Sequence, residues 1–318
     1  FIISASCVIN VGLKPIFADV DINGNLSFDG INKSYTKKVK GIILVHLNGF
    51  PCDMDPIINF AKKNKIKLIE DCSQAHGAKY KNKAVGSFGD ISTWSFCQDK
   101  IISTGGEGGM ISTNNKDVWE KCWSLKDHGK NYFSVFQKKH KFGFKWLHDN
   151  FGSNQRMTEI QSVIGRFQLK KLDSQIKKRN QIAYKVINSL KVFWEKYKLI
   201  SRPYFKCSSC IEKNLKKNCN KCTHAFYRLN LYINVDRKKK LKLLNDLQKS
   251  QVNCNEGPCP EIYREKIFKK LKINPTKKLL NTIKLGKKSL TYHINPFINS
   301  NKLEKDIKTL NQIFSKLI

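Results

Sequence analysis

The chain has 318 residues, of which 59 are Lys or Arg and 25 are Asp or Glu, so its formal net charge is +34. Hydrophobic residues make up 40% of the chain, which excludes a disordered or low-complexity protein. No apolar run approaches the roughly 20 residues that a membrane-spanning helix needs, so no membrane span is expected. A chain of this length is expected to form two domains.

The positive charge comes almost entirely from Lys, since only seven of the 59 basic residues are Arg. Phosphate and base recognition favours Arg for its planar, bidentate group. The Lys residues are also spread along the chain instead of forming one basic tail. We therefore interpret the charge as a solvated surface and expect no nucleic-acid partner. Such a surface still helps to attract an anionic small substrate.

The 11 cysteines do not form the framework of a short secreted protein, which predicts a reducing, cytoplasmic location. The first residue is Phe1 and not Met. Residues 1–9 are predicted as a strand or loop, and we expect the natural N-terminus to lie upstream of them.

The first third of the chain alternates apolar runs with helical periodicity. A helix is predicted at residues 55–64. Strands are predicted at residues 15–20, 41–46, 67–70, 91–96 and 109–112. Strands and helices at this spacing predict βαβ units and therefore an α/β domain with a mostly parallel sheet.

The middle of the chain is predicted to hold a helix at residues 118–126, a long loop at 127–154 and a strongly helical region at 156–190. An apolar stripe and a capping box at Thr158 and Gln161 mark the start of that helical region. Further on, a strand at 226–233 and helices at 240–248 and 303–317 predict a smaller α+β domain. We place the domains at 1–175 and 176–318, with a Cys-rich insert at 205–223.

Three features fall at the ends of predicted strands, where ligands bind in open α/β sheets. Asp71 directly follows an apolar strand, Lys100 lies just past another, and four Gly fall among the five residues 105–109. Partial burial would lower the pKa of Lys100 and make it a nucleophile. For any one Lys in a chain with 52 of them, ordinary solvent exposure is the alternative, and this position alone does not exclude it. A carboxylate and a nucleophilic Lys in this order are what a pyridoxal phosphate (PLP) enzyme needs, for the ring nitrogen and for the covalent link.

Several segments in this order resemble one family. They include Glu70-Asp-Cys-Ser-Gln-Ala-His-Gly-Ala78, Ser95-Phe-Cys-Gln-Asp-Lys100, Gly106-Glu-Gly-Gly-Met110 and Gly152-Ser-Asn-Gln-Arg-Met-Thr-Glu-Ile-Gln161. With them the chain resembles the DegT/StrS-type sugar-nucleotide aminotransferases, a branch of the fold type I PLP enzymes. The resemblance implies the fold type I architecture over nearly the whole chain. The family's upstream segment, with a phosphate-binding turn of small residues, has no counterpart here.

The resemblance also implies roles for individual residues. Lys100 would hold PLP covalently and later move a proton, while Asp71 would pair with the ring nitrogen. Gln74 would orient the ring, Ser95 would bind the phosphate and Phe1 would stack on the ring. Asn154 and Arg156 match a segment that reaches into the neighbouring subunit, which implies a homodimer with shared active sites. His46 is predicted to line the substrate pocket, with a buried core histidine as an equal alternative.

Two Cys-x-x-Cys pairs supply a further motif, formed by Cys207, Cys210, Cys219 and Cys222. Four thiolates at this spacing predict a structural zinc site, with reduced free thiols as the alternative. The motif does not belong to the family pattern, and it supports the rival interpretation of a non-catalytic, basic, zinc-bearing binding protein.

The resemblance implies a PLP-dependent aminotransferase that moves an amino group, from glutamate, to a nucleotide-linked keto-sugar. The product would be an amino sugar for lipopolysaccharide or another surface polysaccharide. Relatives that dehydrate sugars carry His in place of the PLP-binding Lys, so Lys100 favours transamination over the alternative of a PLP-dependent sugar dehydratase.

Overall fold

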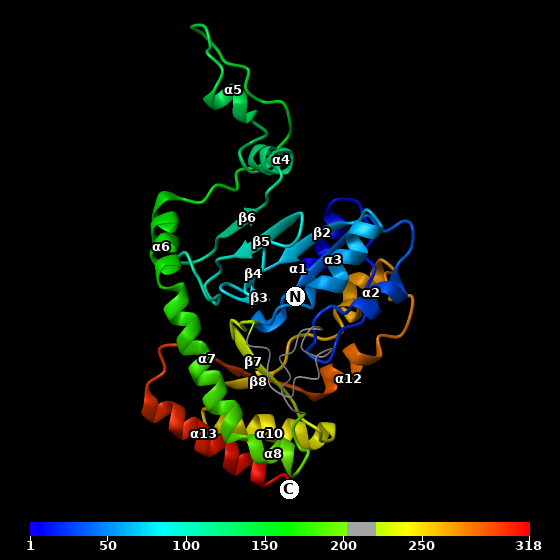
Figure 1. Cartoon of the computed structure of the whole chain (residues 1–318), viewed down its shortest axis with the longest axis vertical. Helices are drawn as coiled ribbons and strands as arrows, with labels where there is room; N and C mark the ends of the chain where they lie inside the picture. The colour runs from blue at the N-terminus through cyan, green and yellow to red at the C-terminus, as the bar shows by residue number, and fades with distance from the viewer. Residues whose placement is uncertain (202–220) are drawn as a thin grey trace.

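The computed structural model describes residues 1–201 and 221–318 (Figure 1). The elements of the first half are α1 (Ile3–Asn10), α2 (Phe28–Ser34), β1 (Gly41–Val45), η1 (Leu47–Gly49), α3 (Met54–Lys63), β2 (Lys67–Asp71), β3 (Lys79–Tyr80), β4 (Lys83–Ala84), β5 (Ile91–Ser95), β6 (Gly109–Ser112), α4 (Lys116–Lys126) and α5 (Tyr132–Phe136). Those of the second half are α6 (Glu159–Lys170), α7 (Leu172–Ser189), α8 (Lys191–Glu195), β7 (Arg228–Tyr232), α10 (Arg237–Lys249), β8 (Cys254–Glu256), η2 (Ile262–Arg264), α11 (Lys266–Lys270), α12 (Leu280–Lys288), β9 (Ser289–His293) and α13 (Ser300–Ser315).

The central sheet has the strand order β1-β2-β5-β6. β1, β2 and β5 are parallel, whereas β6 runs antiparallel to β5 at the edge. The continuous apolar run of β1 is explained by burial, since Leu44 is 0% exposed, and Leu68 of β2 is 3% exposed. The predicted α/β class with a mostly parallel sheet is therefore confirmed, and four of its five predicted strands are present.

A second, antiparallel sheet has the order β7-β9-β8. Apolar residues of this sheet and of α7, α10 and α13 form one buried cluster that includes Leu229, Leu290, Leu243 and Phe314. The predicted strand and helices in this part of the chain are confirmed. In Figure 1, α10 and α13 lie at the opposite end of the molecule from α4 and α5, which extend away from its body.

Two predictions near the N-terminus are wrong. Residues 1–9, expected as a strand or loop, mostly belong to α1 because Ala5 packs against Phe268 and Ile273, far away in the sequence. Residues 15–20, expected as a strand, form no strand, and one bridge joins Val20 to Leu26.

The predicted long helix at 156–190 consists of two helices, α6 and α7, which meet at Lys171. The capping box of Thr158 and Gln161 is present as predicted. The loop at 127–154 contains the short helix α5. The apolar stripe of α6 is largely exposed in the single chain: Ile160, Val163 and Phe167 are exposed, and Ile164 is half-buried.

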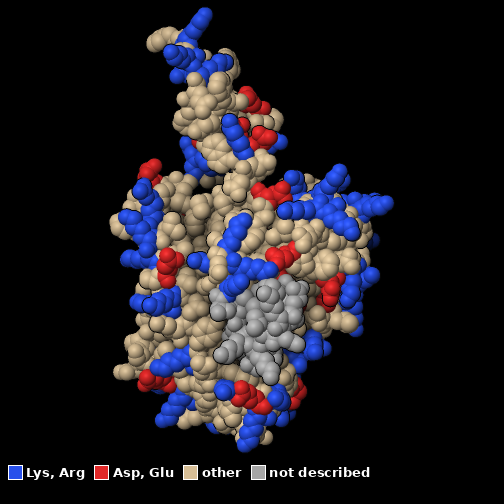
Figure 2. All heavy atoms as spheres, in the orientation of Figure 1, with Lys and Arg blue, Asp and Glu red and all other residues tan. Residues whose placement is uncertain are grey.

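Within the described ranges, no helix is both long and apolar enough to cross a lipid bilayer. Figure 2 shows Lys and Arg side chains scattered over the whole visible face, with Asp and Glu among them. This distribution supports the interpretation of the net charge as a solvated surface.

Candidate active site

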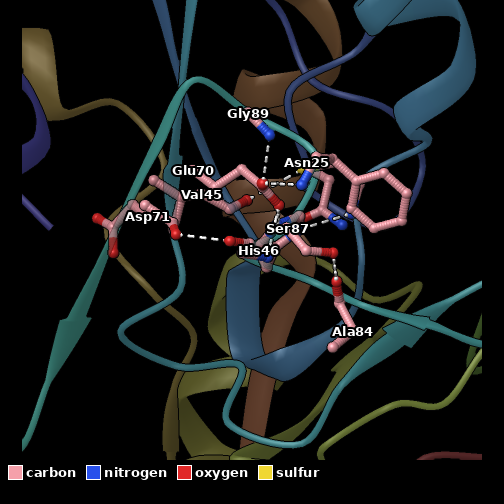
Figure 3. Close-up of polar contacts among 12 residues, drawn as sticks. Asn25, Val45, His46, Glu70, Asp71, Ala84, Ser87 and Gly89 are labelled. Carbon is pink, nitrogen blue, oxygen red and sulfur yellow. Dashed lines mark hydrogen bonds and ion pairs between the residues drawn. The ribbon is translucent and has the colours of Figure 1, made fainter. Parts of the chain in front are cut away.

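The end of β2 presents two adjacent carboxylates to opposite faces of the sheet, because side chains alternate along a strand (Figure 3). Glu70 is fully buried, whereas Asp71 is partly exposed. The Asp71 carboxylate accepts hydrogen bonds from Ser4 Oγ at 2.9 Å and from its own turn at Ser73 N at 3.1 Å. The Ser4 bond attaches α1 to the carboxyl edge of the sheet and orients Asp71 there.

Glu70 forms a buried network on the other face. Its Oε1 accepts backbone N–H groups from Phe88 at 2.7 Å and Gly89 at 2.6 Å. Its Oε2 accepts the N–H of Gly86 at 2.7 Å and bonds to His46 Nε2 at 3.1 Å. Burial alone would raise the pKa of Glu70, but the bonds from His46 and the two glycines outweigh it and lower the pKa.

His46 does not line an open pocket, as was predicted, because its side chain is 0% exposed. Its Nδ1 accepts the backbone N–H of Cys52 at 3.0 Å, so the ring proton lies on Nε2 and is donated to Glu70. Of the two alternatives for this residue, the structure therefore favours the buried core histidine, which connects β1 to β2.

Cys72 lies beside His46 and Glu70, and ligand atoms of the three residues fall within 4.8 Å of one another. They are residue types that bind metals, but the His46 and Glu70 atoms are occupied by bonds to the protein. Burial raises the pKa of Cys72 well above its usual range, so its sulfur stays a protonated thiol. This cluster is a structural network and not a metal centre.

Lys100 lies in the turn that follows β5, next in the sheet to the strand that carries Asp71. Its side chain is 16% exposed, and its Nζ donates to Asp99 Oδ1 at 2.8 Å and to Tyr227 Oη at 3.4 Å. Burial would lower the pKa of Lys100, as was predicted, but the bond and attraction of Asp99 outweigh it. The pKa of Lys100 is therefore raised, and this correction comes from a neighbour whose effect the sequence did not reveal.

The second oxygen of Asp99 is held by residues at the start of the second sheet. Tyr227 donates its hydroxyl to Asp99 Oδ2, and Arg228 Nη2 contacts the same oxygen at 3.3 Å and Tyr227 Oη at 3.0 Å. Burial and then the Asp99 bond raise the pKa of Tyr227, so it stays a neutral donor. Sequence reasoning missed Asp99 and Tyr227, since 128 residues separate them. The only available signal was the position of Asp99 beside Lys100.

Gln74 lies in the loop that follows β2, and Ser95 lies at the carboxyl end of β5. Gln74 Oε1 accepts the backbone N–H of Asn48 at 2.7 Å, and this bond fixes the orientation of the Gln74 amide. Within the described ranges the Nε2 atom of Gln74 has no partner, so it can donate to a ligand. Ser95, the last residue of β5, accepts the N–H of Cys97 at 3.3 Å and keeps its hydroxyl hydrogen available.

Phe1 is 80% exposed and lies one turn before Ser4, whose N–H bonds to Phe1 O at 3.3 Å. Its position near Asp71 thus follows from the Ser4 bond.

Asn154 and Arg156 are exposed and contact each other at 3.0 Å, while Arg156 also bonds to His128 at 3.3 Å. Among the described residues, neither contacts Lys100 or Asp71.

The predicted zinc ligands Cys207, Cys210 and Cys219 lie outside the described residues. Cys222 is described, and its sulfur accepts the backbone N–H of Lys81 at 3.5 Å.

A pocket of about 260 Å³ adjoins the site along β7. Asn230 lines it and lies on the same face of β7 as Arg228, two residues along the strand. Asn48 of η1, which bonds to Gln74, forms another wall, and Lys284 of α12 adds a positive charge.

The sequence model of the DegT/DnrJ/EryC1/StrS aminotransferase family matches residues 1–311. The chain belongs to this family. GDP-perosamine synthase of Escherichia coli O157:H7 is 42% identical over 194 residues, which are 60% of this chain and 50% of that protein. The uncharacterized protein MJ1066 of Methanocaldococcus jannaschii is 32% identical over 257 residues, 79% of this chain and 61% of that protein. The chain thus spans about half the length of the curated relatives that it matches.

The crystal structure of an aminotransferase from Psychrobacter cryohalolentis superposes with a TM-score of 0.92 at 38% identity, covering 99% of this chain and 79% of that one. With this match, the prediction of the fold type I architecture of PLP enzymes is confirmed.

The residues present fit PLP. A partly buried amine, a carboxylate on the neighbouring strand and an unpaired amide donor lie at one edge of the sheet. They are the group types that bind an aldehyde, a ring nitrogen and a ring hydroxyl.

Proposed function

We propose that this chain forms a PLP-dependent aminotransferase that transfers an amino group from glutamate to a nucleotide-linked keto-sugar. One observation carries the proposal. Lys100 is a largely buried amine at the carboxyl edge of the sheet, in the turn after the strand that neighbours Asp71. The names of relatives support the substrate class, since they include a GDP-perosamine synthase, a UDP-N-acetyl-3-dehydro-alpha-D-glucosamine 3-aminotransferase and a dTDP-sugar transaminase.

The chain's own residues would divide the work. Bound PLP supplies an electron-withdrawing ring that stabilises negative charge at the substrate carbon. Asp71, held by Ser4, would keep the ring nitrogen protonated, while the amide of Gln74, turned by Asn48, would orient the ring. Lys100 Nζ would hold the cofactor between turnovers and move the proton during each one.

Ser95 would bind the phosphate through its hydroxyl, and Phe1 would cover one side of the ring. The pocket along β7 would bind the part of the substrate that bears the diphosphate, because Lys284 gives the pocket a positive charge. Asn230 connects it to the Lys100 site, since it lies two residues along β7 from Arg228 on the same face. The product would be an amino sugar for a surface polysaccharide such as lipopolysaccharide.

The active form would be a homodimer. The face of α6 exposes Ile160, Val163 and Phe167 by 75%, 50% and 60%, and the edge strand β6 exposes Met110 and Ile111 by 52% and 47%. Apolar residues gathered on neighbouring elements are typical of a protein interface. Because Asn154 and Arg156 do not contact Lys100 of their own chain, they would complete the partner's site.

A cytoplasmic location is consistent with the cysteines, since no disulfide joins Cys7, Cys52, Cys72, Cys97, Cys122, Cys254 or Cys259.

The zinc site also stays a prediction. The N–H bond from Lys81 to Cys222 is of the kind that supports a metal-bound thiolate. One zinc per chain, measured by elemental analysis and lost in Cys222→Ser, would support it, and a metal-free folded protein would contradict it.

The test of the function is product analysis with the full-length enzyme, glutamate and keto-sugar nucleotides. Formation of 2-oxoglutarate together with an amino-sugar nucleotide supports transamination. Loss of a sugar hydroxyl without a new amine supports the dehydratase instead. Salt-sensitive binding to DNA or RNA without either product would support the non-catalytic alternative.

A further inference from the structure

The two oxygens of the Asp99 carboxylate bind different partners, one in the turn after β5 of the first sheet and the others at the start of the second sheet. Oδ1 accepts from Lys100 Nζ at 2.8 Å, and Oδ2 accepts from Tyr227 and lies 3.3 Å from Arg228. Tyr227 and Arg228 lie at the start of β7, in the second sheet, whereas Asp99 and Lys100 follow β5 in the first. Each oxygen therefore has its own partners, and those of Oδ2 orient Oδ1 toward the amine.

We propose that Asp99 is a positioning residue, whose carboxylate is clamped by Tyr227 and Arg228 so that it holds the Lys100 ammonium whenever Lys100 is not bonded to the cofactor. The proposal rests on the proposed function for its place in catalysis, but the contacts exist in the chain itself. Asp99 is 45% exposed, so it also reaches the solvent side of the site.

The consequence concerns the proton. An amine released from the cofactor must be neutral before it can take a proton from the substrate carbon. A carboxylate at 2.8 Å favours the charged amine instead, and the pKa of Lys100 is raised despite burial. Asp99 thus keeps the released Lys100 side chain in place. It also moves the pH range in which the Lys100 amine is neutral toward higher pH.

Other charged or titratable groups face this pair from each neighbouring element. Arg228 is the first residue of β7 and Tyr227 directly precedes it, while His293 on β9 is the register partner of Arg228. His76, in the loop after β2, stays neutral because burial and then Lys100 lower its pKa to about 4. Asp99 is the acidic group among them that bonds to Lys100.

The test measures the Lys100 amine directly in the full-length protein without cofactor. Its rate of acetylation by acetic anhydride is followed against pH, and the peptide that contains Lys100 is quantified by mass spectrometry. An opposite charge at this distance shifts a pKa by about 1–3 units, and the partial exposure of Asp99 places the effect near the lower end. Asp99→Asn should therefore lower the midpoint of reactivity by about one unit.

Two variants make the result specific. Asp99→Glu restores a carboxylate and should return the midpoint toward the wild-type value. Asp117→Asn removes an exposed carboxylate from the first turn of α4 and should leave the midpoint unchanged. An unchanged midpoint in folded Asp99→Asn would overturn the proposal.

Turnover gives a second, separate readout. If the enzyme is an aminotransferase, the acid limb of its kcat profile shifts to lower pH in Asp99→Asn, while KM for the sugar changes little. A wild-type protein without turnover would contradict the proposed function but leave the labelling midpoints intact, so the two failures are distinguishable.

Discussion

Replacement of Glu70 by Gln should destabilise the protein strongly, although the two side chains have nearly the same shape. Each carboxylate oxygen of Glu70 has two donors: Phe88 N and Gly89 N on Oε1, and Gly86 N and His46 Nε2 on Oε2. A Gln amide has only one oxygen, so either orientation leaves two buried donors opposite an NH₂ group. His46 cannot relieve this by moving its proton, because its Nδ1 accepts from Cys52.

The expected loss follows from these contacts. A buried donor left without a partner costs about 1–3 kcal/mol, so two of them cost about 2–6 kcal/mol. Glu70 is 0% exposed, and water cannot substitute for the missing acceptor without opening the network. Since 1.4 kcal/mol corresponds to about tenfold in an equilibrium, amide protection at Gly86, Phe88 and Gly89 should fall by at least about tenfold.

The assay is hydrogen–deuterium exchange of the loop that follows β4, together with urea denaturation followed by circular dichroism. Glu304→Gln is the control, since the Glu304 side chain is 65% exposed and pairs with Lys185 at 3.2 Å. The control should lose no more than about 0.5 kcal/mol. Equal protection in Glu70→Gln and wild type would refute the network as a determinant of stability.

Three further predictions concern other parts of the molecule. Burial lowers the pKa of His76 to about 4, below that of an unfolded His, so the stability from its neutral form is complete above about pH 6.5 and is lost as the pH falls toward 4. His76→Phe should remove up to about 3 kcal/mol of this acid dependence in denaturation curves at pH 4–7, and an unchanged slope would speak against it. Ile160→Lys on α6 should convert dimer to monomer in sedimentation velocity, whereas Leu241→Lys, at a residue 49% exposed on α10, should not; a dimeric Ile160→Lys protein would exclude the α6 interface. Lys284→Ala should raise KM for the nucleotide sugar about tenfold or less with kcat nearly unchanged, as expected for uniform binding, and an unaltered KM would remove the β7 pocket from the substrate site.

The elements that could be predicted from the sequence are those whose burial is visible in a short window. β1 is a continuous apolar run, whereas β2 holds only the apolar pair Leu68 and Ile69. The helix α3 carries Ile57 and Ala61 at helical spacing, with both residues buried. Their periodicity reflects the same faces that the structure buries, so local pattern and tertiary packing agree.

Elements that depend on distant partners were not predictable in this way. α1 is helical because Ala5 packs against Phe268 and Ile273. The segment before Val20 has the composition of a strand but pairs with no strand in the described structure. Neither outcome is encoded in the neighbouring residues alone.

The candidate site shows the same limit. The positions of Asp71 and Lys100 near strand ends followed from the order of strands. In the structure Asp71 is the last residue of β2, and Lys100 lies in the turn after the neighbouring strand β5. The charge state of Lys100 did not follow, because it depends on Asp99 and on the clamp that Tyr227 provides from the second sheet. The pocket prediction for His46 failed because its bond to Glu70 forms across two strands.

The central claim is that Lys100 is the residue that holds PLP. The most direct test loads the full-length protein with PLP, reduces it with borohydride, and maps the added mass by peptide mass spectrometry. We expect the label to lie on Lys100, and we expect Lys100→Ala to lose both the label and the visible absorption band. A label on another lysine, or none in the folded wild-type protein, would contradict it.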